Sequence, residues 1–317
     1  MRLSHPFQKV KDEISKVIVG QEEMIDSLFV ALLSNGHVLL EGVPGLAKTT
    51  SVNTLSKVLD LGFKRVQFTP DLLPSDIIGM EIYDPKESEF KIKHGPIFTN
   101  LLLADEINRA PAKVQSALLE AMQEKQVTIG EESFALPSPF LVMATQNPIE
   151  SEGAYHLPEA QLDRFMLKIL LDYNTKEEEL LIARRVANGV WQQVQKLMSK
   201  DDLQSSKETI KAIHIDEEVE AYMIDLVYAT RFPKKYDLED ISPLIRVGAS
   251  ARGSIDLYKG VKAHAYLRGR DHVTPVDVAS MLKPVLRHRI ILSYEAEAEG
   301  ISADEIIDKI LKKLPLP

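Results

Sequence analysis

The sequence predicts an α/β fold, with a parallel sheet sandwiched by helices, followed by a second, all-helical domain. Up to about Asp172, short apolar runs alternate with helical patterns, and from about Thr175 only helical patterns continue. Runs that are apolar on both faces and separated by helices are typical of buried parallel strands. The runs are residues 37–41, 65–69, 100–104, 140–145 and 167–171. The predicted domains are therefore residues 1–174 and 175–317.

Helix signals support this division. Pro111 to Glu124 has one apolar stripe and a proline suited to the first helical position. In the second domain, a stripe from Leu180 to Val194 predicts a helix. Two sites have capping-box spacing, Thr274 with Asp277 and Ser302 with Glu305. Pro284 should kink or end the helix that contains it.

Composition excludes several classes of protein. The chain has 317 residues and a net charge of -9, which argues against nucleic acid as the main partner. It has no cysteine, and its eight histidines form no paired zinc motif. The start does not resemble a signal peptide, and no apolar run is long enough to span a bilayer. We therefore expect a soluble cytoplasmic protein.

A glycine-rich loop lies between the first predicted strand and a helix expected to begin near Lys48. Backbone N–H groups at such a helix start can cradle phosphates, the lysine meets the outer phosphates, and the next hydroxyl holds Mg²⁺. Ala47 stands where the general pattern has glycine, which would admit phosphate if its φ is negative. A plain Gly/Pro turn is the alternative. The predicted ATP-binding residues are Gly42, Val43, Pro44, Gly45, Leu46, Ala47, Lys48, Thr49 and Thr50.

Two acids follow the apolar run Leu101 to Ala104. Ligands of open α/β sheets bind beyond the carboxyl ends of the strands, where Asp105 and Glu106 would lie. One carboxylate can hold Mg²⁺, and its neighbour can polarise the attacking water. We assign Asp105, with Thr49, to the metal and Glu106 to the role of base. The pattern predicts ATP hydrolysis.

At these motifs the chain resembles AAA+ ATPases, and more narrowly the MoxR family. The loop GVPGLAKT, including Ala47, is similar to the family's usual form. The segments 105–111 and 115–122 resemble its Walker B strand and following helix, and 144–148 its sensor-1 strand end. Residues 157–165 resemble the arginine-finger helix. The resemblance implies an AAA+ αβα core followed by a helical lid.

The resemblance also implies roles for residues outside the loop. Asn147 would bond the γ-phosphate and orient water, and Arg164 would reach the nucleotide of an adjacent subunit. Arg252, in a segment that departs from the family at Ala251, would lie over the phosphates of its own subunit. Val19, Gly20 and Gln21 occupy the place where these proteins wrap adenine. Each residue also has a plain structural alternative. Asn147 would belong to an Asn-Pro turn, and Arg164 and Arg252 would be solvated surface arginines. Val19, Gly20 and Gln21 would form an ordinary turn between two helices.

Two further segments resemble features of one AAA+ clade. Residues of about 70–98 are too long and too rich in Pro and Gly for a plain helical crossover, and resemble a β-rich insert facing a ring's pore. Residues of about 126–137 read as a hairpin turning near Gly130, similar to the hairpin that precedes sensor 1. Both suit a protein that moves elements when ATP is hydrolysed.

The resemblance implies an ATP-driven, chaperone-like remodeller that forms a ring, typically a hexamer. Its implied partners are proteins with von Willebrand factor A domains, in assembly, folding or metal insertion. A chelatase subunit or a nucleic-acid motor of the same clade is the alternative. A non-hydrolysing nucleotide-dependent scaffold is a third, which Glu106 opposes because a scaffold needs no base.

Overall fold

A computed structural model describes residues 1–317 except residues 1–5, 44, 148–154, 156 and 190–191. The chain divides into two compact units. The first comprises residues 1–157 and 169–204, and the second residues 158–168 and 205–317. This division differs from the predicted boundary at residue 174. One reason is that the backbone N–H groups of Leu197 and Met198 donate to the carbonyl of Val58, at 2.9 and 3.3 Å, which ties this stretch to the first unit.

A five-stranded sheet forms the centre of the α/β part, in the order β2-β5-β8-β1-β9. The predicted strands are confirmed, each within two residues, and the pairs β2–β5, β5–β8 and β8–β1 are parallel. Strand residues such as Leu39, Leu102 and Val142 are fully buried, as expected of strands covered on both faces. The strand bounds are β1 (Val38–Glu41), β2 (Phe63–Gln67), β5 (Leu101–Asp105), β8 (Leu141–Gln146) and β9 (Leu167–Leu170).

Helices cover this sheet. Helix α2 (Glu22–Ser34) packs on β1, and α3 (Lys48–Val58) packs on β2 and β5. Helix α1 (Pro6–Ser15) contacts α3, and its Phe7 ring lies edge-on to that of Phe29, with centroids 5.2 Å apart. Helix α5 (Ala112–Glu124) confirms the predicted helix, with Pro111 at its N-cap rather than inside it.

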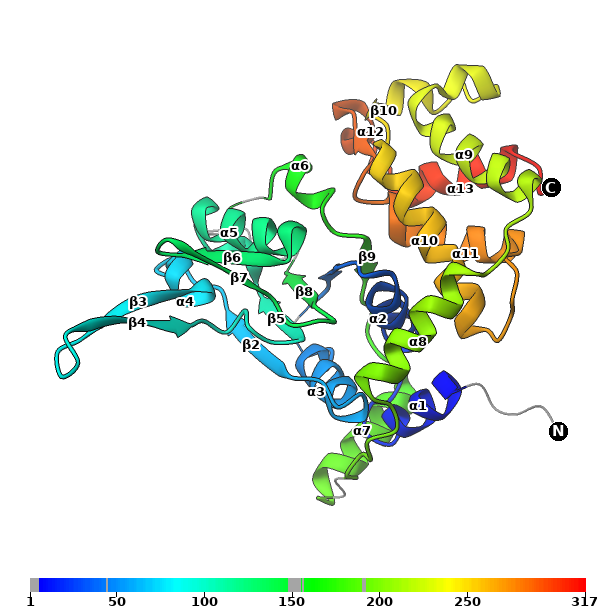
Figure 1. The fold of residues 1–317 in the computed structure, drawn as a ribbon. Coiled ribbons are helices and arrows are strands. Elements are labelled where there is room, and N and C mark those ends of the chain that lie inside the picture. The colour runs from blue at the N-terminus through cyan, green and yellow to red at the C-terminus, as the bar shows by residue number, and fades with distance from the viewer. Residues whose placement is uncertain (1–5, 44, 148–154, 156, 190–191) are drawn as a thin grey trace. The chain divides into compact units, whose positions relative to one another are not determined.

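The two segments predicted to be β-rich are hairpins. A short helix α4 (Pro74–Ile78) leads into the antiparallel pair β3 (Gly79–Asp84) and β4 (Glu89–His94), which projects away from the sheet (Figure 1). Strands β6 (Gln126–Ile129) and β7 (Glu132–Ala135) form the second hairpin. Gly130 lies at its turn with a φ of 61°, a conformation that glycine adopts without strain. The β-rich insert predicted for residues of about 70–98 and the hairpin predicted for residues of about 126–137 are both found.

The second part is helical, as predicted, and contains one small strand pair in addition. Strands β10 (Ile245–Val247) and β11 (Ile291–Leu292) form a small antiparallel pair, which is too short for a sequence pattern to reveal. Its helices are α6 (Glu159–Leu162), α9 (Glu217–Arg231), α10 (Ala251–Leu267), α11 (Pro275–Leu286), α12 (Tyr294–Ala298) and α13 (Ala303–Lys313), while α8 (Lys200–Lys211) crosses the division. Both capping boxes are confirmed, at α11 and α13, and α11 ends two residues after Pro284.

The stripe from Leu180 to Val194 is only partly a helix. Helix α7 (Lys176–Ala187) ends at Ala187, and none of its residues is buried. Leu180 and Val186 remain 51% and 53% exposed, so the apolar stripe does not face a core within the chain. Val190 lies outside the described residues. Within the part of the chain that the structure describes, no helix is long and apolar enough to cross a membrane.

Candidate nucleotide site

The glycine-rich loop joins β1 to α3 and lines a cavity of about 360 Å³ in the first unit. Pro44 lies outside the described residues. Of the eight described loop residues predicted to bind ATP, seven line the cavity and Val43 does not. The described lining residues are Gly42, Gly45, Leu46, Ala47, Lys48, Thr49, Thr50, Arg65, Asp105, Glu106, Thr145, Gln146 and Asn147.

The backbone of the loop explains its small residues. Gly45 has a φ of 92°, and a Cβ placed on Gly42 would lie 2.8 Å from the Cβ of Leu171. Ala47 has a φ of 54°, so the condition of a negative φ, under which alanine would replace glycine without strain, is not met. Glycine is common at such a position because its left-handed conformation costs no strain. Helix α3 begins at Lys48, as predicted, and its first N–H groups lack partners within the helix.

Lys48 supplies the lysine ammonium group of this cavity. Its Nζ donates a hydrogen bond of 2.6 Å to the carbonyl of Gly42. Burial lowers the pKa of Lys48, while the nearby carboxylates of Asp105, Glu106 and Glu41 partly oppose that shift. An anion that entered the cavity would oppose it further, because opposite charge favours the ammonium form.

Thr145, at the end of β8, fixes both acids that follow β5. Its hydroxyl donates to Oδ1 of Asp105 over 2.6 Å and accepts from the backbone N–H of Glu106 over 2.8 Å. Glu106 has a φ of 56° and a ψ of 51°, a left-handed conformation that non-glycine residues seldom adopt. Such strain is concentrated at functional sites. The two acids therefore lie side by side at the cavity, as the sequence predicts.

Three residues that the sequence analysis did not single out as site residues contact the acids. Arg65 donates to Oδ2 of Asp105, at 3.0 and 2.7 Å from its Nε and Nη2. Gln67 donates to Oε2 of Glu106 at 2.7 Å, and Arg109 donates to the same oxygen at 2.9 Å. Gln67 pairs in register with Asp105 across β2 and β5. The available sequence signal was a polar residue, Gln67, at the end of β2. This signal can be interpreted only when the strand order is known, because the order places β2 beside β5.

Asn147 follows β8 directly and lines the same cavity as Thr49 of the loop. The described residues contain no cluster of three or more His, Cys, Asp or Glu side chains that could hold a metal by themselves. Thr49 and Asp105 nevertheless supply a hydroxyl and a carboxylate to one cavity. One or two such oxygen ligands completed by substrate phosphates are the set that Mg²⁺ prefers.

Val19, Gly20 and Gln21 lie in the connection between α1 and α2 and are not among the described lining residues of the phosphate cavity. Asn174 donates to the carbonyl of Val19 over 2.9 Å, and Gln21 donates to the carbonyl of Asp172 over 3.1 Å. A Cβ on Gly20 would lie 2.7 Å from the amide nitrogen of Asn174. The turn is therefore held against the chain that follows β9.

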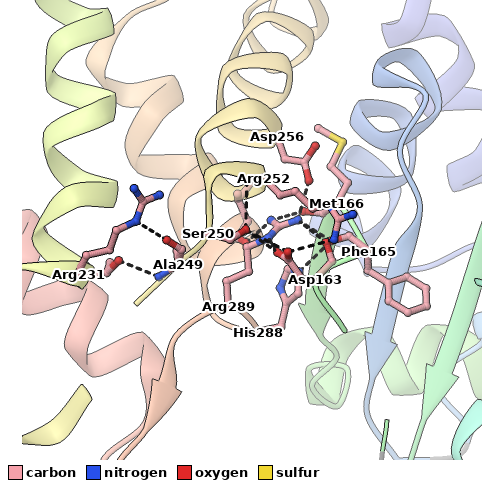
Figure 2. A network of polar contacts seen from close by, with 12 residues as sticks. Asp163, Phe165, Met166, Arg231, Ala249, Ser250, Arg252, Asp256, His288 and Arg289 are labelled. Atoms are coloured by element: carbon pink, nitrogen blue, oxygen red, sulfur yellow. Dashed lines mark hydrogen bonds and ion pairs between the residues drawn. The ribbon is translucent and has the colours of Figure 1, made fainter. Parts of the chain in front are cut away.

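Arg164 and Arg252, the two predicted arginines, belong to the second unit. Arg164 follows α6, and Arg252 is the second residue of α10, whose N-cap is Ser250. The structure joins their segments through Asp163, which contacts Ser250, Arg252 and Arg289 (Figure 2). Neither Asp163 nor Arg289 was predicted from the sequence to be a site residue.

Comparisons with known proteins agree with this architecture. Residues 37–167 match the model of the ATPase family associated with various cellular activities (AAA), and residues 238–310 match the AAA lid domain. The chain is 47% identical to Chaperone MoxR1 of Mycobacterium tuberculosis over 99% of its own length and 83% of that protein. It is 30% identical to Protein MoxR of Paracoccus denitrificans, over 98% and 96% of the two chains.

A solved structure supports the same assignment. A crystal structure of a candidate ATPase from Cytophaga hutchinsonii is 55% identical and has a TM-score of 0.93, covering 98% of this chain and 95% of that one. The αβα core, its phosphate loop and the lid define an AAA+ ATPase. The chain belongs to the MoxR family of these ATPases.

Proposed function

We propose that the chain is a Mg²⁺-dependent ATPase that works as a ring oligomer and remodels other proteins in a chaperone-like manner. The observation that carries this proposal is the single cavity lined by Lys48, Thr49, Asp105, Glu106 and Asn147. These residue types meet the needs of ATP hydrolysis: a cation for phosphates, oxygen ligands for a metal, a base and a neutral amide.

Each side chain has a separate task in this proposal. Lys48 and the N–H groups of the loop bind the phosphates, and Thr49 with Asp105 would hold Mg²⁺, which when bound neutralises phosphate charge. Glu106 accepts a proton from the attacking water at its carboxylate, and Asn147 orients that water. Gln67 and Arg109 both donate hydrogen bonds to Oε2 of Glu106. They therefore hold the carboxylate in place until the attacking water replaces them as its partner.

Three other roles complete the site. Val19, Gly20 and Gln21 contact adenine, Arg252 binds phosphates from the same subunit, and Arg164 acts on the nucleotide of a neighbour. The family assignment and the presence of both arginines in the lid-bearing unit support this proposal.

We further propose that its partners are proteins with von Willebrand factor A domains, and that it assists their assembly, folding or metal insertion. A relative, Chaperone MoxR1, supports the chaperone class by its name. The β3–β4 hairpin is a candidate contact for such a client, because Tyr83 and Phe90 are 50% and 69% exposed there with ring centroids 5.3 Å apart.

Charge on this hairpin favours a protein over a nucleic acid as the client. Lys91 forms ion pairs with Asp84 at 2.9 Å and with Glu87 at 2.7 Å. Lysines paired in this way add little to the positive field that attracts phosphate backbones. A fluorescence-anisotropy titration with DNA at moderate salt should therefore show no micromolar, salt-sensitive binding.

The decisive test of hydrolysis is Glu106→Gln. The amide cannot take a proton from water, so turnover should fall by at least about 100-fold, as is usual for loss of a general base. ATP binding and any ATP-dependent oligomer should remain, as measured by equilibrium binding and analytical ultracentrifugation. Hydrolysis at the wild-type rate would show that Glu106 is not the base. Affinity capture with this variant and ATP, from its native cell, would then identify the client.

A further inference from the structure

The carboxylate of Asp163 contacts two arginines, of which one is buried and the other is exposed (Figure 2). Its Oδ1 accepts a 2.8 Å hydrogen bond from Nε of Arg289. Its Oδ2 lies 3.4 Å from Nη1 of Arg252 and 3.0 Å from the hydroxyl of Ser250. Arg164, the proposed finger, is the next residue of the same segment.

Arg289 is the fixed partner. Its side chain is only 1% exposed, and its guanidinium also binds Asp256 at 2.6 Å. It further donates to the carbonyls of Phe165 and Met166, at 2.9 and 3.2 Å. A planar fork with this many bonds fixes the backbone on both sides of Arg164.

Arg252 is the exchangeable partner. Its side chain is 48% exposed, and its contact with Asp163 is the longest of the bonds to that carboxylate. Ion pairs between exposed groups are weak. A phosphate group offers an arginine shorter and stronger charge-assisted bonds. Arg252 can therefore leave Asp163 when phosphates compete for it.

We propose that Asp163 is a positioning residue that competes with nucleotide phosphates for Arg252 and links this exchange to the placement of Arg164. The proposal rests on the proposed roles of both arginines. When nucleotide draws Arg252 away, Asp163 keeps Arg289 and Ser250 as partners, so the backbone of this segment stays fixed. The loss of Arg252 changes the charge beside the Arg164 side chain, and that side chain responds to the change. Nucleotide binding in one subunit thereby affects Arg164 of that subunit, which acts on the nucleotide of the neighbouring subunit.

Binding of a hydrolysis-resistant fluorescent ATP analogue with Mg²⁺ tests the competition. Asp163→Asn removes the competing charge, so the analogue should bind about 1.5- to 5-fold more tightly, the range expected for one exposed ion pair. The gain must depend on Arg252: Arg252→Ala should bind the analogue more weakly than wild type. The double variant Asp163→Asn/Arg252→Ala should bind it as Arg252→Ala does. A merely structural role for Asp163 predicts no such dependence.

Asp256→Asn is the matched control. It removes the other carboxylate of Arg289 but leaves the contact between Asp163 and Arg252, so affinity for the analogue should not increase. If Asp163→Asn does not fold, Ser250→Gly serves instead. Glycine is nearly as good as serine at a helix N-cap, but it lacks the hydroxyl that holds Asp163 beside Arg252. It should tighten binding in the same Arg252-dependent direction.

Turnover tests the link to Arg164. Asp163→Asn should lower kcat by at least about tenfold while binding tightens, because a small misplacement of a catalytic group is costly. Lys48→Ala subunits cannot use ATP but carry an intact Asp163 and Arg164, so mixing them in should restore part of the activity per Asp163→Asn subunit. No activity would be restored if Asp163→Asn damaged the nucleotide site of the subunit that carries it.

The outcomes separate this inference from the proposed function. Weaker binding by Arg252→Ala, together with unchanged binding by Asp163→Asn and by Ser250→Gly, would overturn the competition and leave the role of Arg252 intact. Wild-type turnover by Asp163→Asn would overturn the link to Arg164. Wild-type binding by Arg252→Ala would overturn both the inference and the proposed role of Arg252.

Discussion

At the scale of single residues, the site contains two non-glycine residues in the left-handed region. Ala47 and Glu106 have φ values of 54° and 56°, and both line the cavity. Such a conformation costs about 1–2 kcal/mol for an L-residue, and it persists where the surrounding structure requires it. At Ala47, the chain must turn directly into α3. At Glu106, the chain must change direction immediately after the end of β5.

The strain at Ala47 gives a stability prediction. Ala47→Gly should relieve the left-handed conformation, partly offset by the greater entropy of glycine in the unfolded chain, and stabilise the protein by up to about 1 kcal/mol. Ala47→Val, the matched change in the other direction, should destabilise it by about 1–3 kcal/mol because branching at Cβ disfavours this conformation. Thermal unfolding measures both; equal midpoints for the two variants would contradict the argument.

Thr145 gives a prediction about activity. Thr145→Val loses the hydroxyl that binds both Asp105 and the N–H of Glu106, which should lower kcat roughly tenfold, equivalent to about 1.4 kcal/mol. It should also cost about 1–3 kcal/mol of stability, since Thr145 is 2% exposed and the N–H of Glu106 loses its partner. Thr145→Ser keeps the hydroxyl and should stay near wild type in steady-state hydrolysis. An equal loss in both variants would mean that the hydroxyl is not the cause.

At the scale of elements, a buried carboxylate organises the start of α11. Asp277 is fully buried, and it accepts hydrogen bonds from Arg270 at 2.5 and 2.7 Å and from the backbone N–H of Thr274 at 2.8 Å. His264 on α10 lies 2.6 Å from the same carboxylate. Burial raises the pKa of Asp277, but hydrogen bonds from His264, Arg270 and Thr274 outweigh burial and hold that pKa well below its usual range.

This arrangement predicts a pH-dependent stability. Because the folded-state pKa of Asp277 is depressed, its contribution is complete above the unfolded pKa of about 3.9 and is lost as pH falls toward the folded value. Asp277→Asn should cost about 3 kcal/mol at pH 7, the low end for a broken buried ion pair because Arg270 is 27% exposed.

Urea unfolding at several pH values checks this prediction. The difference in unfolding free energy between wild type and Asp277→Asn should shrink below about pH 4. Asp308→Asn, which breaks a pair with Lys283 at a carboxylate that is 44% exposed, is the control and should cost less than about 1 kcal/mol. A difference for Asp277→Asn that is constant from pH 7 to pH 3 would contradict the depressed pKa.

At the scale of the whole molecule, the residues proposed to act on ATP belong to both compact units. The phosphate loop and the acids lie in the first, while Arg164 and Arg252 lie in the second. The segment of residues 158–168 joins the helical unit because Arg289 and Arg246 bind it, Arg246 through Glu159 at 2.5 Å. Any movement of the lid-bearing unit would therefore carry Arg164 with it.

Subunit mixing tests whether the site is shared between subunits. Arg164→Ala should lower turnover by about 10³-fold or more, the usual contribution of an arginine finger. Mixed with Lys48→Ala, which supplies Arg164 but cannot use ATP, it should regain part of the activity in a ratio-dependent manner, measured as phosphate release. Arg109→Ala, mixed in the same way, is the comparison for the other arginine near Glu106. A lack of recovery for Arg164→Ala at every ratio would count against action in trans.

Much of the fold was predictable because its signals are local. Buried strands, the loop before Lys48, the acids after β5 and the two capping boxes each depend on residues close in sequence, and the structure confirms them. The β10–β11 pair, the early end of α7 and the left-handed φ of Ala47 were not predicted. The first is too short to produce a pattern. Helix α7 ends just before Gly189, whose φ is 64°, and the φ of Ala47 belongs to the turn at the N-cap of α3, where a sequence pattern does not specify the backbone angle.

The sequence by itself determined the class of the protein, since the phosphate loop, the acids of β5 and the family resemblance are written in contiguous residues. Only the tertiary structure decided which side chains surround them. Thr145, Arg65 and Gln67 reach the acids because β2 and β8 flank β5, and Asp163 reaches Arg252 because Arg289 gathers three separate segments. Strand order and buried ion pairs join residues far apart in the chain, so no local pattern contains them.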